Sequence, residues 1–167
     1  GQLLFRLVKE FQPETIIDLG TSLGLTTLYL SEGNPAAKIT TIEGCSETLA
    51  VAKENFAKYG AKNIEGIEGN FDDVLGTALG ANKKADFVFF DGNHRKIPTL
   101  NYFELCLKEA HNDSVFIFDD INWSDEMAEA WDEIKKHPSV TVSVDLFFMG
   151  IVFFRKELSK ENFIIKF

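Results

Sequence analysis

Cysteine is scarce in this sequence, which excludes a scaffold held together by disulfides. Only Cys45 and Cys106 occur among 167 residues. Their spacing matches no metal-binding or redox motif, so they favour a reducing compartment, and we expect the chain to be cytoplasmic. Both thiols are expected to be small buried side chains.

Long apolar runs and an excess of basic charge are also missing, and each absence excludes a class of partner. The longest apolar stretch, about residues 146–154, is far shorter than the ~20 residues of a membrane-spanning helix. No signal peptide is visible, so no membrane partner is expected. Lys and Arg total 17 against 26 Asp and Glu, a net charge of −9. Binding to a nucleic-acid backbone needs clustered basic residues, so no nucleic-acid partner is expected either.

Strand-like and helix-like segments alternate along the chain. This alternation predicts an α/β fold, a doubly wound sheet with helices on both faces. The last two strands are joined too tightly for a helical crossover, so the last strand should be antiparallel in a mostly parallel, seven-stranded sheet. The length suits one domain spanning residues 1–167. The predicted strands are 15–19, 38–43, 63–67, 85–90, 114–118, 140–146 and 150–154, and the predicted helices are 3–11, 25–30, 47–59, 71–79, 98–110 and 125–136.

Acidic residues stand at or near the carboxyl end of each of the first five predicted strands. In an open α/β sheet, ligands bind beyond these strand ends. A purely structural sheet has no reason to gather carboxylates along one edge, so the pattern predicts a ligand site. The acids are Asp18, Glu43, Glu68, Asp91 and the pair Asp119 and Asp120.

The turn after the first strand carries glycines but not the dinucleotide-binding pattern. Gly20 and Gly24 follow Asp18, whereas Ser22 and Leu25 occupy the third and sixth places of a G-x-G-x-x-G frame. The turn therefore disfavours a nicotinamide-dependent dehydrogenase, which needs backbone amides close to a pyrophosphate. Glycines let the backbone pass close to a ligand, and the acid suits a ligand that bears an amino group.

Glu43 completes this prediction for the cofactor. It lies 23 residues after Gly20, at the end of the second predicted strand. An acid about 20 residues beyond the glycine turn typically accepts hydrogen bonds from ribose hydroxyls. A nucleoside joined to an amino acid describes S-adenosylmethionine.

Residues 17–24 resemble motif I of class I S-adenosylmethionine-dependent methyltransferases, in the variant whose middle glycine is replaced. Residues 1–24, 86–91 and 118–123 are similar to catechol O-methyltransferase-like bacterial enzymes. Residues 118–123 also resemble the Asp-Asp segment of macrocin-type sugar O-methyltransferases. The resemblance covers essentially the whole chain. It implies a Rossmann-like fold and methyl transfer to a hydroxyl of a small molecule.

The resemblance also implies which residues hold the cofactor. Asp18 and the turn would surround its methionine portion, Glu43 its ribose, and Asn70 and Phe71 its adenine. The full implied set is Asp18, Gly20, Thr21, Ser22, Gly24, Glu43, Gly44, Asn70, Phe71 and Asp91.

A magnesium site is implied at Asp91, Asp119 and Asp120. The third ligand is usually Asn in the catechol enzymes, so Asp120 places this chain closer to the macrocin type. Carboxylates from adjacent strand ends repel one another unless a cation or protons intervene, and magnesium prefers oxygen ligands. In the alternative interpretation, Asp120 caps the segment that follows while Asp119 alone touches a ligand.

The catalytic prediction rests on His94, together with Asp91. The catechol enzymes carry a lysine base three residues after the first metal aspartate, and His94 stands at that place. Histidine is a competent base near neutral pH, but it is also a metal ligand or a capping residue in other proteins. Lys96 is a rival base. Trp123 is either an aromatic wall for the acceptor or a core or rim residue.

Three hypotheses follow for function. The first is an O-methyltransferase acting on a small hydroxylated molecule, with or without magnesium. The second is an N-methyltransferase of the same fold, which should tolerate loss of Asp119 and Asp120. The third is a binding module that keeps the cofactor pocket without transfer. The sequence leaves the acceptor and the oligomeric state open, although Phe163 and Phe167 offer a candidate surface for a homo-oligomer.

Overall fold

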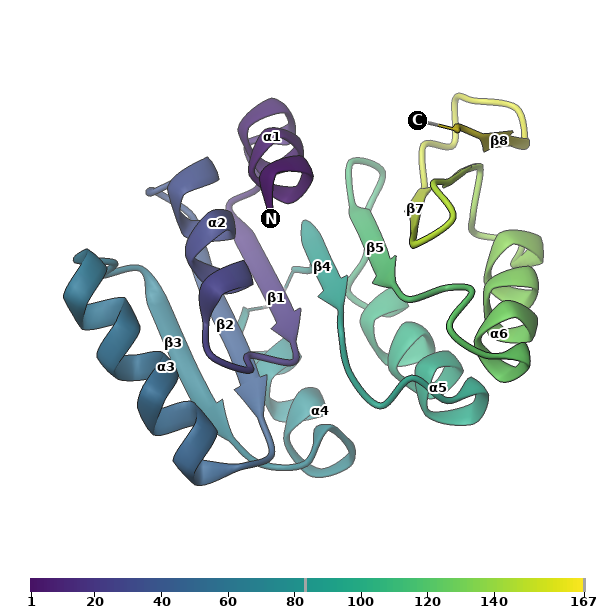
Figure 1. Cartoon of the computed structure of the whole chain (residues 1–167). Coiled ribbons are helices and arrows are strands. Elements are labelled where there is room, and N and C mark those ends of the chain that lie inside the picture. The colour runs from purple at the N-terminus through teal and green to yellow at the C-terminus, as the bar shows by residue number, and fades with distance from the viewer. Residues whose placement is uncertain (83, 167) are drawn as a thin grey trace. The chain divides into compact units, whose positions relative to one another are not determined.

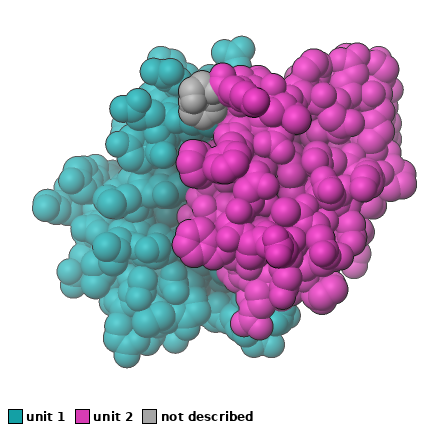
Figure 2. All heavy atoms as spheres, turned by 45° about the vertical axis from the view of Figure 1, so that its right-hand side comes forward, with its two compact units in different colours: residues 1–83 teal, residues 84–167 magenta. Residues whose placement is uncertain are grey.

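The computed structural model describes residues 1–82 and 84–166 (Figure 1). The chain forms two compact units, unit 1 from Gly1–Lys83 and unit 2 from Lys84–Phe167 (Figure 2). The expectation of a single cofactor-binding domain across residues 1–167 therefore stays a prediction. Phe167, one of the two residues proposed for an oligomer surface, lies outside the described residues, whereas Phe163 is 46% exposed.

Unit 1 is a parallel α/β unit in which the strand order is β3-β2-β1. β1 and β2 are largely buried on both faces, as expected for a parallel sheet, and Ile16, Ile17 and Leu19 of β1 are at most 1% exposed, whereas β3 has no buried residue. The elements are α1 (Gln2–Phe11), β1 (Thr15–Leu19), α2 (Leu25–Gly33), β2 (Lys38–Glu43), α3 (Ser46–Tyr59), β3 (Ile64–Glu68) and α4 (Phe71–Asn82).

The register of unit 1 decides which residues share a face of its sheet. Asp18 pairs with Thr41, which in turn pairs with Gly66. A Cβ at Gly66 would lie 3.0 Å from Leu49 of α3, so this row of residues faces α3. Thr40, one residue earlier on β2, accepts a hydrogen bond from Asn82 at the end of α4. Because neighbouring strand residues point to opposite faces, α3 and α4 cover opposite faces of the unit 1 sheet.

Unit 2 contains a mixed sheet in the order β4-β5-β7-β6-β8. β4 and β5 are parallel, and β7 is antiparallel to both β5 and β6, which confirms the predicted antiparallel strand. The elements are β4 (Phe87–Phe90), α5 (Lys96–Leu107), β5 (Val115–Asp119), α6 (Asp125–Lys136), β6 (Val142–Asp145), β7 (Met149–Phe153) and β8 (Glu161–Ile164).

The prediction of seven strands missed β8. This strand pairs in parallel with β6, and all four of its residues are exposed. It is an edge strand with no buried face, so it leaves no alternation of apolar and polar residues in the sequence. The described residues therefore contain eight strands.

Several predicted helix boundaries differ from the structure. α2 continues to Gly33, α4 continues to Asn82, and α5 begins at Lys96 and ends at Leu107. Pro98 lies in the first turn of α5, as its missing N–H requires. The predicted bounds of α6 are confirmed, and the Ser124 hydroxyl caps it by accepting from the Met127 N–H at 3.2 Å.

The expectation that both cysteines are buried is wrong for Cys45. Cys106 is buried, whereas Cys45 is an exposed free thiol at the N-cap of α3, next to the exposed residues Ser46 and Glu47. Among the residues that the structure describes, no helix combines the length and the apolarity that crossing a bilayer requires.

Candidate functional site

The glycine turn after β1 is built from left-handed backbone. Gly20, Ser22 and Gly24 have φ values of 118°, 47° and 79°. The N–H groups of Gly20 and Thr21 both donate to the Ile42 carbonyl, at 3.1 and 3.2 Å. The turn is thereby held at the carboxyl end of β2. Ser22 is a non-glycine residue in this conformation, which is uncommon and costs backbone strain.

Glu43 is fixed at this turn by two backbone amides. Its Oε2 accepts from the Ser22 N–H at 2.9 Å, and its Oε1 accepts from the Cys45 N–H at 3.1 Å. Each carboxylate oxygen keeps a further lone pair, so Glu43 can still accept two hydroxyl hydrogen bonds. Gly44 leaves space beside it, since a Cβ there would meet only the Gly69 carbonyl, at 3.9 Å.

Asn70 and Phe71 begin α4 in the same unit. The Asn70 side chain accepts from the Asp72 N–H at 3.2 Å, and its carbonyl accepts from the Val74 N–H. Asn70 is exposed and Phe71 is half-buried. Asn70 therefore caps the helix, and its predicted contact with adenine stays a prediction.

Asp18 is fully buried, which the sequence did not indicate. Its Oδ2 accepts hydrogen bonds from the hydroxyls of Thr27 at 2.6 Å and Thr41 at 2.8 Å. Its Oδ1 has no hydrogen-bond partner among the described residues. Burial raises the pKa of Asp18 to about 6, and the two threonine hydrogen bonds oppose that shift. Sequence reasoning missed Thr27 and Thr41, each of which is the second of two threonines between apolar residues.

This raised pKa predicts a pH-dependent stability. The folded state holds the Asp18 proton more tightly than the unfolded chain, so the contribution is full below about pH 4 and is lost as the pH rises through 6. A shift from 3.8 to about 6 corresponds to about 3 kcal/mol. In urea unfolding, the stability of the wild type relative to Asp18→Asn is expected to fall by up to about 3 kcal/mol between pH 4 and 7. A difference that stays constant over this range would contradict the prediction.

Asp91 and His94 lie together in unit 2, directly after β4. Nε2 of His94 is 3.7 Å from Oδ1 of Asp91, and both side chains are 30% exposed. Between them, Asn93 adopts a φ of 63° and its side chain donates to the Tyr102 hydroxyl at 2.9 Å. The loop is thereby anchored to α5, and the pair predicted for catalysis is brought together.

Asp119 and Asp120 form a second acidic group at the end of β5. Burial raises the pKa of Asp119 above its ordinary value, the Asp120 carboxylate raises it further, and His94 acts in the opposite direction. Asp120 adopts a φ of 53°, and its carbonyl accepts from the Trp123 N–H at 2.9 Å. A nearby cation or a bound proton would therefore stabilise the Asp119 carboxyl group.

The acids of unit 2 do not form a complete metal cage by themselves. Within residues 1–82 and 84–166, no group of three or more His, Cys, Asp or Glu side chains is arranged to hold an ion. The chemistry of Asp91, Asp119 and Asp120 nevertheless suits magnesium, which binds through one or two carboxylates and keeps several waters.

Lys96 is poorly suited to the role of base. Its ammonium lies 2.8 Å from both the Glu129 and Glu133 carboxylates of α6. Hydrogen bonds to these two acids raise the pKa of Lys96 far above its ordinary value. A lysine held in this way keeps its proton, so the geometry favours His94.

Three aromatic side chains of unit 2 are strongly exposed. Trp123 is 73% exposed, which excludes a core role, whereas Trp131 is buried. Phe147 and Phe148, at the turn between β6 and β7, are 63% and 66% exposed and were missed by the sequence analysis. The Asn122 side chain donates to the Phe147 carbonyl at 2.8 Å, which ties this turn to the segment after Asp120.

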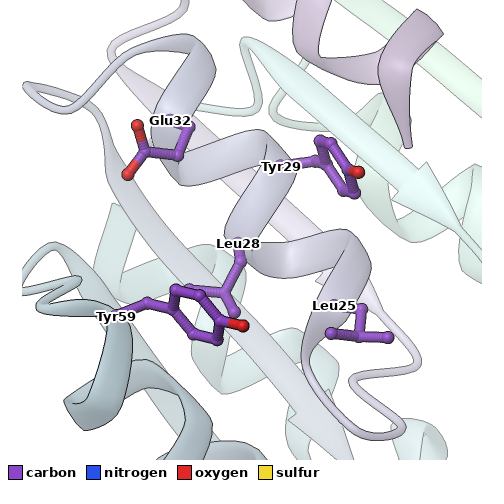
Figure 3. Close-up of a pocket in the computed structure, with 5 residues that line it drawn as sticks. All are labelled: Leu25, Leu28, Tyr29, Glu32 and Tyr59. Atoms are coloured by element: carbon purple, nitrogen blue, oxygen red, sulfur yellow. The ribbon is translucent and has the colours of Figure 1, made fainter.

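A surface pocket lies on α2 and α3 of unit 1. Figure 3 shows its apolar lining with a single carboxylate, and the lining residues are Leu25, Leu28, Tyr29, Glu32 and Tyr59. No residue of the predicted site belongs to this lining, although Leu25 directly follows Gly24.

The family described as "Methyltransferase domain" matches residues 17–121, which include the turn, Glu43 and both acidic groups. The chain belongs to this methyltransferase family. It is 33% identical over 116 residues to the transmembrane O-methyltransferase homolog of Rattus norvegicus, covering 66% of this chain and 43% of that relative. It is 27% identical to the catechol O-methyltransferase of Mycobacterium tuberculosis, covering 72% of this chain and 54% of the relative. The chain thus spans about half the length of these curated relatives or less.

Solved structures confirm the predicted Rossmann-like fold. The O-methyltransferase TomG from Streptomyces achromogenes, in complex with SAM, matches with a TM-score of 0.79 at 22% identity, covering 92% of this chain and 78% of TomG. At this level of identity the likeness shows the fold, a mostly parallel α/β sheet with antiparallel strands near the C-terminus.

Proposed function

We propose that this methyltransferase domain transfers the methyl group of S-adenosylmethionine to a hydroxyl oxygen of a small molecule. The choice of oxygen over nitrogen rests on the acidic side chains of unit 2 and on His94 beside them. Asp91 lies beside His94. Burial and the neighbouring Asp120 carboxylate raise the pKa of Asp119. Removing a proton from a hydroxyl calls for a base or a cation, whereas a neutral amine needs neither. The named relatives, which are O-methyltransferases, support the same choice.

The residues of unit 1 would hold the cofactor. Glu43, fixed by the Ser22 and Cys45 amides, would accept the ribose hydroxyls. The turn of Gly20, Thr21, Ser22 and Gly24 would border the methionine portion, with Asn70 and Phe71 toward the adenine. When bound, S-adenosylmethionine supplies a methyl group on a positively charged sulfur, which leaves as a neutral thioether.

The residues of unit 2 would prepare the acceptor. We propose that one or two of the carboxylates of Asp91, Asp119 and Asp120 would hold magnesium, since the three are not arranged as a complete cage. The ion would lower the pKa of the bound hydroxyl. His94 would accept the hydroxyl proton at Nε2, while Asp91 stabilises the resulting imidazolium. The exposed ring of Trp123 would border the acceptor.

Two other functions fit the same fold. An N-methyltransferase would not need Asp119 and Asp120, and a binding module would bind the cofactor without transfer. Our proposal includes a small-molecule partner, no nucleic-acid or membrane partner, and a cytoplasmic location, where the exposed thiol of Cys45 stays reduced. A homo-oligomer stays an option of the proposal.

Cofactor binding is tested by calorimetric titration of S-adenosylmethionine into the wild type, Glu43→Gln and Glu65→Gln. Glu43→Gln is expected to bind about tenfold more weakly, because hydrogen bonds to a charged acceptor are lost. Glu65 is exposed on β3, 3.9 Å from Lys38, so Glu65→Gln is the control and should bind as the wild type does. No binding by a folded wild type would overturn the proposal. Catechol serves as the probe acceptor for activity, since one relative is named for it.

A further inference from the structure

Four buried polar side chains of unit 1 form one continuous hydrogen-bond network. Asp18, Thr21, Thr27 and Thr41 are each at most 1% exposed. Asp18 Oδ2 accepts from Thr27 and Thr41, at 2.6 and 2.8 Å, and the hydroxyls of Thr21 and Thr41 are 2.6 Å apart. Buried polar groups of this kind are costly unless satisfied, so each member constrains the others.

The direction of the hydrogen bonds follows from the carboxylate. An ionised carboxylate only accepts, so Thr27 and Thr41 must both donate to Asp18. The single proton of the Thr41 hydroxyl is then used, and Thr41 is left to accept from Thr21. One charged group thereby orients three hydroxyls, the last of which belongs to the glycine turn.

The network joins the glycine turn to three elements around it, the first of which is β1 with Asp18. Thr27 lies in the first turn of α2, Thr41 lies in β2, and Thr21 lies within the turn itself. The next residue, Ser22, has the strained φ of 47° and donates its N–H to Glu43. A strained residue keeps its conformation only where its surroundings hold it, and Thr21 is the adjacent buried anchor.

We infer that the network of Asp18, Thr41 and Thr21 sets the conformation of the turn at residues 20–24 and so sets the affinity for the cofactor. Asp18 is then a positioning residue, which acts through the threonines and not by touching the cofactor. This inference rests on the proposed binding of S-adenosylmethionine at the turn. It departs from the role that the family resemblance implied for Asp18, which was contact with the methionine portion.

Thr41→Val and Thr40→Val are a matched pair for the test. Both residues lie on β2, are at most 2% exposed and lose one hydroxyl in an isosteric change. Thr40 points to the opposite face, where its hydroxyl accepts from Asn82 at 3.1 Å. Thr41→Val loses the hydrogen bonds with Asp18 and Thr21, whereas Thr40→Val loses the one with Asn82, so Thr41→Val should be the less stable of the two. Only Thr41→Val breaks the path to the turn, and both variants are compared under conditions in which both are folded.

Two measurements decide the inference. In calorimetric titration with S-adenosylmethionine, Thr41→Val is expected to bind about tenfold more weakly and Thr40→Val within about twofold of the wild type. In hydrogen exchange, the amides of residues 20–24 should exchange faster in Thr41→Val than in Thr40→Val. Thr41→Ser keeps the hydroxyl and should restore both readouts.

Equal affinity and equal exchange in the two valine variants would overturn the inference. If a folded wild type binds no S-adenosylmethionine, the proposed function is wrong, and the exchange of residues 20–24 still decides whether the network controls the turn. If Thr41→Val fails to fold while Thr41→Ser and Thr40→Val fold normally, Thr21→Val takes its place, because it breaks the same path at the turn.

Discussion

Asp119→Asn is expected to lower methyl transfer to catechol about 100-fold. The side chain keeps its shape but loses its negative charge. Burial and the Asp120 carboxylate destabilise that charge, and a bound cation would stabilise it. Asparagine is also a weaker ligand for magnesium than a carboxylate. The acceptor hydroxyl would then keep its proton, so the loss should fall on kcat more than on the affinity for S-adenosylmethionine.

Asp113→Asn is the control for this prediction. Asp113 lies shortly before the first residue of β5, whereas Asp119 is its last. Asp113 forms a surface ion pair with Arg155 at 3.8 Å, so its replacement should leave the rate of methyl transfer unchanged. Titration of magnesium alone should give heat with the wild type and with Asp113→Asn, but not with Asp119→Asn. Full activity of Asp119→Asn toward catechol would contradict the role proposed for Asp119, whereas transfer by the wild type to an amine but not to catechol would favour the nitrogen acceptor. Cofactor binding without transfer to any acceptor would favour the binding module.

The alternation of strands and helices was sufficient to predict the fold, because a buried strand is a short apolar run and an amphipathic helix repeats its apolar residues every three to four positions. β8 was missed because this exposed edge strand shows neither pattern in the sequence. The same alternation predicted that Glu43 and Asp119 end strands and that Asp91 directly follows one, as they do in β2, β5 and β4.

What the sequence could not show was how each of these acids is used. Asp18 and Glu43 both lie at the carboxyl ends of buried strands. Asp18 is buried and accepts hydrogen bonds from two threonine hydroxyls, whereas Glu43 accepts one from the Ser22 N–H of the turn. Lys96 and His94 were rival bases until the structure placed two carboxylates 2.8 Å from the Lys96 ammonium. These differences come from partners on other elements, which a pattern along one chain does not encode.

Gly24→Ala is expected to lower the free energy of unfolding by about 4 kcal/mol. Gly24 has a φ of +79°, a conformation that L side chains rarely adopt. An added Cβ would meet the Phe56 ring, with Cζ 2.9 Å away, and would lie 3.2 Å from the Cβ of Ala52. Phe56 and Ala52 form a buried cluster with Leu28, so the ring has little room to move aside. Urea unfolding followed by circular dichroism measures the loss.

Gly76→Ala separates this effect from the general cost of replacing a glycine. Gly76 lies inside α4 with nothing within 4 Å of a built Cβ, so alanine there should stabilise the protein by about 0.5–1 kcal/mol. Adding Phe56→Leu to Gly24→Ala removes the edge of the ring and should recover part of the loss. The backbone strain at Gly24 persists in that double variant, so recovery should be incomplete. Strictly additive effects of the two substitutions would show that the ring is not what excludes a side chain from the turn.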